Sequence, residues 1–138
     1  MNWKRIALGT LAAGLLIDVF EGGFSNLIVG AQFQREYASL GVHNQFTPLS
    51  AAFFIGWGFI VGFAAVFLYA AARPRLGGGP RTALPVALAL WAVHGLVPHL
   101  RDAFLGIFSF SLSLEFAGLQ LVWLVAGTLL ILPVRVRR

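Results

Sequence analysis

The chain has 138 residues, of which 59% are hydrophobic and only 11% carry a charged side chain. Because soluble domains have about 25% charged residues, this composition leaves too few charges to cover a surface in water. The chain has no cysteine, which excludes disulfide bonds and thiolate-held iron–sulfur or zinc sites.

Four segments approach the length of about 20 apolar residues that a helix needs to cross a bilayer. They cover residues of about 6–28, 48–72, 82–100 and 112–132. We therefore predict an all-α fold, in which residues 1–138 form a single integral membrane domain built as a four-helix transmembrane bundle. The first segment follows Lys4 and Arg5, as in a signal peptide, but it is longer than a signal peptide's apolar part. We interpret it as a retained span.

The basic residues indicate the orientation of this bundle. Eight of the ten Lys and Arg residues precede span one, join spans two and three, or follow span four, and only Arg35 and Arg101 fall on the other side. Basic residues concentrate on the cytoplasmic side of membrane proteins. We therefore predict cytoplasmic N and C termini in a bacterial inner membrane. The basic clusters are then contacts for anionic lipids and not for nucleic acid.

The connections add local expectations. The polar segment after span one should emerge on the outer side, where Phe33 and Tyr37 suit a short helix lying among lipid headgroups. In span two, Gly58 and Gly62 would let another helix approach closely, either within the monomer or across a dimer seam. Pro74 and the glycines that follow it should end span two, and Pro80 or Pro85 should start span three.

In three features the chain resembles a group of small four-span bacterial membrane proteins that have no known activity. These are the start Met1 to Trp3, an acidic patch late in span one, and an arginine–proline–glycine turn between Arg73 and Arg81. The resemblance implies the topology described above and no activity.

Ionisable residues inside the spans are the main functional clue, because charge that faces lipid is costly. All five carboxylates and all three histidines fall in the outer half of the predicted bundle. At 100° per residue, Asp18, Glu21 and Ser25 share one narrow stripe of span one. His94, Arg101 and Glu115 lie at a comparable depth below the outer ends of spans three and four. We therefore predict that they are the partners of Asp18 and Glu21 in a polar cavity, with Arg101 as the balancing positive charge.

Pro98 and three tryptophans complete the candidate pocket. If the helix continues through Pro98, the carbonyl of His94 loses its usual partner and opens onto the cavity; alternatively, Pro98 ends span three. Trp57, Trp91 and Trp123 lie within the spans and not at the membrane surfaces. They could line a pocket or pack in the core with each indole N–H bonded to a neighbour.

Four functions could use such a cluster. The carboxylates and His94 could bind a proton or a cation, or Asp18, Glu21, His94 and Glu115 could ligate a metal ion. They could act as acid and base on an apolar, lipid-like substrate, or they could only fix the packing of the helices. Because four short spans enclose little volume alone, the chain should form a homo-oligomer or join a larger membrane complex. The sequence identifies no catalytic residue and no cofactor.

Overall fold

The computed structural model describes residues 2–43 and 47–131, with side chains described as far as residue 128. In chain order the elements are α1 (Trp3–Ile17), the π-helix η1 (Asp18–Ser25), α2 (Asn26–Ser39), α3 (Pro48–Leu76), α4 (Pro80–Leu90), the π-helix η2 (Trp91–Leu96), α5 (Val97–Phe104) and α6 (Phe110–Ile131). Nothing in this described part of the chain is a strand, so the predicted all-α class is confirmed.

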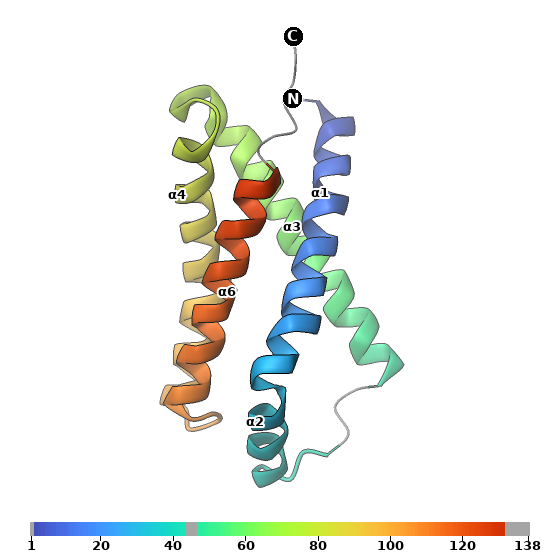
Figure 1. Cartoon of the computed structure of the whole chain (residues 1–138), viewed down its shortest axis with the longest axis vertical. Coiled ribbons are helices and arrows are strands. Elements are labelled where there is room, and N and C mark those ends of the chain that lie inside the picture. The colour runs from blue at the N-terminus through green and yellow to red at the C-terminus, as the bar shows by residue number, and fades with distance from the viewer. Residues whose placement is uncertain (1, 44–46, 132–138) are drawn as a thin grey trace.

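The elements join into four rods: α1–η1–α2, α3, α4–η2–α5 and α6. Figure 1 shows α6 alongside the third rod, while α3 crosses α1 at an angle. Each rod contains a helix that is long and apolar enough to cross a membrane. The rod surfaces are apolar as well, since Leu27 and Leu49 are more than 80% exposed and Val93 is 75% exposed. Side chains of this kind suit a lipid environment and not water. The chain therefore has the helices of a multi-pass membrane protein.

One end of the bundle carries the basic residues. In Figure 1 the start of α1, the α3–α4 turn and the end of α6 all lie at the top. This end includes Lys4, Arg5, Arg73, Arg75 and Arg81. The described basic residues are therefore grouped in the way that the sequence predicted.

The first rod is longer than the predicted span. It is helical throughout from Trp3 to Ser39, which is 37 residues, with the π-helix η1 in its middle. At about 1.5 Å per residue it is much longer than the roughly 30 Å core of a bilayer. The predicted short helix around Phe33 and Tyr37 is therefore the outer end of this rod and not a separate element, and its place among lipid headgroups stays a prediction. Both rings pack edge-on against Phe108 of the α5–α6 loop, with ring centroids 5.3 and 5.0 Å away.

Glu36 ties this extension to the beginning of α6. Its carboxylate accepts hydrogen bonds from the backbone N–H and the hydroxyl of Ser109, at 2.8 and 2.6 Å. Ser109 in turn accepts a bond from the backbone N–H of Leu112, as an N-cap residue does. A carboxylate beside a helix N-terminus is also favoured by the helix dipole. Glu36 therefore anchors the extension of the first rod to the N-terminus of α6.

The α1–α3 crossing depends on glycine. A Cβ atom added to Gly62 would lie 2.7 Å from the backbone nitrogen of Gly14, so the two backbones are nearly in contact. Gly9 faces Val66 one step further along the same crossing. The small residues of span two therefore serve packing within the monomer, which was one of the two alternatives that the sequence left open.

The α3–α4 turn is held by two hydrogen bonds from or to side chains. The hydroxyl of Tyr69 accepts a bond from the N–H of Gly79 at 3.0 Å, and the hydroxyl of Thr82 donates to the carbonyl of Gly77 at 2.6 Å. Pro74 lies inside α3 and does not end it; the helix ends at Gly77, which has a φ of 88°. Such an angle suits glycine. Pro80 begins α4, as predicted.

Candidate functional site

Two π-helical segments mark the middle of the bundle. η1 interrupts the first rod and η2 interrupts the third, and both contact α6. The third rod continues through Pro98, so Pro98 does not end the span, and the N–H of Val97 bonds to the carbonyl of Ala92, five residues back. π-Helical turns are rare and occur frequently at functional sites. Asp18, Glu21, Trp91 and His94, all predicted as site residues, lie on these two segments.

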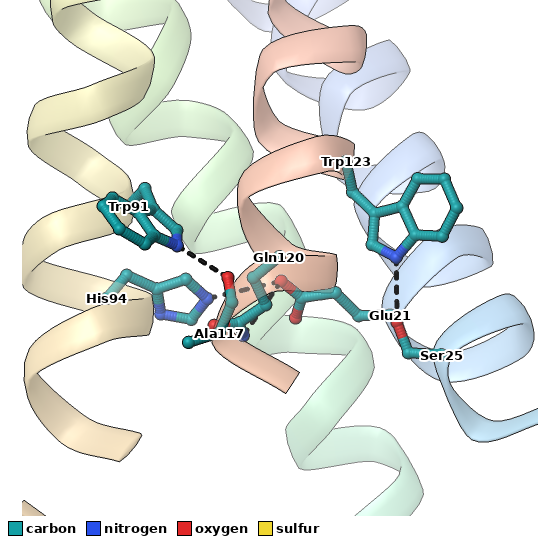
Figure 2. A network of polar contacts seen from close by, with 7 residues as sticks. All are labelled: Glu21, Ser25, Trp91, His94, Ala117, Gln120 and Trp123. Atoms are coloured by element: carbon teal, nitrogen blue, oxygen red, sulfur yellow. Dashed lines mark hydrogen bonds and ion pairs between the residues drawn. The ribbon is translucent and has the colours of Figure 1, made fainter. Parts of the chain in front are cut away.

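Glu21 and His94 face each other across the bundle (Figure 2). The Oε1 atom of Glu21 lies 3.6 Å from Nε2 of His94, and the two side chains are 19% and 13% exposed. The side-chain amide of Gln120, on α6, donates a 3.2 Å hydrogen bond to the same carboxylate oxygen. Nε2 of His94 is buried, and 3.6 Å is too long for a hydrogen bond. One carboxylate and one imidazole thus meet in a partly enclosed site.

Two tryptophans support the pair from either side. The indole N–H of Trp91 donates to the carbonyl of Ala117 at 2.7 Å, and that of Trp123 donates to the hydroxyl of Ser25 at 2.8 Å (Figure 2). Trp123 also stacks on Phe20, with ring centroids 4.7 Å apart. These bonds agree with the core-packing interpretation of Trp91 and Trp123. Ser25 is completely buried beneath Trp123, so it does not line an open pocket.

Asp18 does not share a face with Glu21. Its carboxylate packs against Gly58 of α3, where any added Cβ atom would overlap it. Glu21 instead points toward α6 and η2. The predicted stripe assumed 100° per residue, whereas a π-helix has more residues in each turn and so rotates less per residue. The smaller rotation per residue in η1 therefore turns Asp18 away from the stripe, while Glu21 and Ser25 both remain on the side of α6.

Arg101 and Glu115 lie outside the pair. Arg101 is 65% exposed and binds its neighbour Asp102 at 2.7 Å, so the prediction that it balances the charge of Glu21 is wrong. Glu115 is exposed on α6 and is not one of the partners of Glu21 or His94.

The predicted metal set is not assembled. Among the described residues, no three His, Cys, Asp or Glu side chains lie close enough together to hold a metal ion. Asp18 faces α3 and Glu115 is exposed, which leaves only Glu21 and His94 of the four predicted ligands. Nor is any described Asp, Glu, Lys or Arg residue fully buried. The prediction of buried carboxylates is corrected: Asp18 and Glu21 are half-buried, as are Glu36 and Asp102 further out, and Glu115 is exposed.

An apolar groove lies beside His94. It has a volume of about 330 Å³ and runs between α3 and the third rod. Its wall residues include Trp57, Ile60, Ala64, Val93, His94 and Pro98. The rings of Trp57 and His94 lie 5.7 Å apart, centroid to centroid. Trp57 and Pro98 therefore line a pocket, as predicted, although the pocket is apolar and His94 is its ionisable residue.

Gln120 and His99 are the site neighbours that the sequence did not select. Gln120 is 3% exposed and reaches Glu21, while its Oε1 atom lies 2.6 Å from the position that a Cβ atom of Gly95 would take. His99 packs edge-on against Phe116, with centroids 4.8 Å apart. A lone glutamine in an apolar span was the available signal for Gln120, because buried amides require partners.

Comparisons with known protein families, with curated proteins and with solved structures found no match to this chain.

Proposed function

We propose that this chain is a membrane protein that takes up and releases protons at the Glu21–His94 pair. The observation that carries the proposal is the approach of these two ionisable groups, 3.6 Å apart, between rods that could cross a membrane. Ionisable groups inside spans commonly serve proton or ion movement. The pair contains one group of each kind needed to pass a proton, a carboxylate and an imidazole.

The surroundings favour a proton over a larger cation. A cation such as Na⁺ or Ca²⁺ is bound by several oxygen ligands. Among the described residues, Glu21 is the one carboxylate in the Glu21–His94 contact. A proton needs only one acceptor. Gln120 donates to Glu21 Oε1 and so holds the carboxylate in place whichever nearby atom carries the proton.

The experiment is proton flux into liposomes that contain the purified protein, an imposed pH gradient and an enclosed pH-sensitive dye. We expect flux above that of protein-free liposomes, reduced at least to about one-tenth in Glu21→Gln and in His94→Gln. Glu115→Gln is the matched control, because Glu115 is exposed and separate from the pair. Equal flux in wild type, Glu21→Gln and protein-free liposomes would refute the proposal.

Infrared difference spectra give a second measurement that does not need transport. Acidification should produce the C=O band of a protonated carboxylic acid in wild type. This band should be weaker in Glu21→Gln and unchanged in Glu115→Gln after subtraction of the signal from exposed carboxyls. A band that persists unchanged in Glu21→Gln would assign the proton to another residue.

The orientation forms part of the proposal. We propose that the basic end faces the cytoplasm of a bacterial inner membrane, with the α5–α6 loop outside. Because the chain has no cysteine, single substitutions give a clean test. A membrane-impermeant maleimide should label Ser39→Cys but not Arg75→Cys in intact cells, and the reverse pattern would invert the topology. The predicted homo-oligomer, complex partner and lipid-like substrate stay predictions.

A further inference from the structure

We infer that the groove beside His94 binds a single-chain lipid alcohol, whose hydroxyl group donates a hydrogen bond to Nδ1 of His94. The inference rests on the Glu21–His94 pair of the proposed function, but it does not require that a proton passes through that pair.

The shape of the groove indicates a single chain. Its volume of about 330 Å³ is near the lower end of the range for small-molecule sites, about 300 to 1,000 Å³. Trp57, Ile60 and Val93 are 41%, 59% and 75% exposed, so the groove opens on the side of the bundle and not at its end. In a membrane that side faces hydrocarbon, and an apolar chain can enter directly from the bilayer.

His94 defines the polar end of the ligand. The other wall residues that the groove exposes are apolar apart from the indole of Trp57. Nε2 of His94 is buried and points toward the carboxylate of Glu21 (Figure 2). A neutral imidazole whose Nε2 faces a carboxylate carries its proton on Nε2. Nδ1 is then an acceptor, and no described residue donates a hydrogen bond to it.

This tautomer discriminates between ligand head groups. A hydroxyl group can donate to Nδ1, whereas an ether or a simple ester has no donor to offer. A charged head group would have to be carried into an apolar groove without a counter-ion, which is unfavourable. The expected ligand is therefore uncharged, has one apolar chain, and ends in a hydroxyl group.

The test uses undecanol brominated on the carbon next to the hydroxyl-bearing carbon, together with the methyl ether of the same compound. Bromine quenches tryptophan fluorescence on contact, and Trp57 adjoins His94. Titration of each compound into nanodiscs that hold the protein is compared with the same titration of Trp57→Phe, which isolates the contribution of Trp57. We expect saturable quenching by the alcohol at a mole fraction about fivefold lower than for the ether, as one hydrogen bond would give.

Two variants and one control complete the experiment. His94→Leu removes the acceptor and should abolish the preference for the alcohol. Ala64→Phe fills the groove and should abolish saturable quenching by both compounds, while Ala89→Phe, an exposed residue outside the groove, should change neither. Equal quenching by alcohol and ether would overturn the inference, as would unchanged binding in Ala64→Phe.

The outcome is independent of the flux experiment. Ala64 does not contact Glu21, so Ala64→Phe should lose alcohol binding and keep proton flux. Selective alcohol binding without flux in wild type would refute the proton function alone. Flux without a preference for the alcohol would refute the ligand alone.

Discussion

Gly62→Ala tests the crossing that holds α1 against α3. The added Cβ atom would lie 2.7 Å from the nitrogen and 3.0 Å from the Cα atom of Gly14, both backbone atoms that cannot rotate away. Ordinary contacts begin at 3.4 Å, so α1 and α3 must separate by about 0.7 Å. Overpacking of this kind costs about 1 to 3 kcal/mol. Replacing a helical glycine with alanine regains up to about 1 kcal/mol.

Gly56→Ala provides the matched control on the same helix. Nothing lies within 4 Å of the Cβ position at Gly56, so this variant gains helix propensity without an overlap. The free energies of unfolding of the two variants should therefore differ by about 1 to 3 kcal/mol, with Gly62→Ala the less stable. The assay is equilibrium unfolding in mixed micelles with an increasing fraction of a denaturing detergent, followed by circular dichroism.

A difference smaller than about 0.5 kcal/mol between the two alanine variants would refute the close approach of Gly14 and Gly62. If Gly62 instead formed a dimer seam, Gly62→Ala would dissociate a dimer and leave the unfolding of the monomer unchanged. Sedimentation in matched-density detergent separates these two results.

Two further substitutions probe the bonds that frame the site. Glu36→Gln should lower the free energy of unfolding by about 1 kcal/mol, because it removes charge-assisted bonds to Ser109 at a partly exposed position. Glu115→Gln in the same unfolding assay should change this free energy by less than about 0.5 kcal/mol. Equal effects of the two substitutions would contradict the role of Glu36. Trp123→Phe keeps an aromatic ring but leaves the hydroxyl of Ser25 without its donor, so we expect the free energy of unfolding to fall by about 1 to 3 kcal/mol. A stability equal to wild type would show that the bond to Ser25 contributes nothing.

The architecture was largely predictable because it follows from local composition. Four apolar segments and their flanking basic residues are visible without any knowledge of contacts. The first rod is the exception. The polar residues after position 28 predict that the span ends there, but Glu36 bonds to Ser109, a residue 73 positions away, and this distant contact favours a helix that continues to Ser39. No local pattern contains that information.

The site was predictable in its residue types and not in its geometry. Glu21 and His94 were selected because ionisable groups in spans require an interior partner, and they face each other. Asp18 and Arg101 were selected by the same reasoning and lie elsewhere. Asp18 was misplaced because the wheel assumed regular α-helix through η1. Arg101 was misplaced because its neighbour in sequence, Asp102, is a nearer partner than any group in the interior.

The two π-helical segments support the proposal that the Glu21–His94 pair does more than fix the register of the helices. A single π-turn could arise from a local packing mismatch, but here two separate rods have one each, both contact α6, and each contributes one member of the pair. A pair that served only packing would be expected to close to hydrogen-bond distance, whereas Nε2 of His94 stays 3.6 Å from the carboxylate. Local geometry that weakens packing persists where function requires it.

This reasoning gives a last prediction. Glu21→Gln preserves the acceptor for Gln120 and removes a charge from the interior, so its free energy of unfolding should equal or exceed that of wild type while its proton flux falls. Gln120→Leu is the contrasting variant: it removes the donor to Glu21 and should lower stability by about 1 to 3 kcal/mol. A loss of stability in Glu21→Gln as large as that in Gln120→Leu, with flux unchanged, would mean that the pair serves only the packing of the helices.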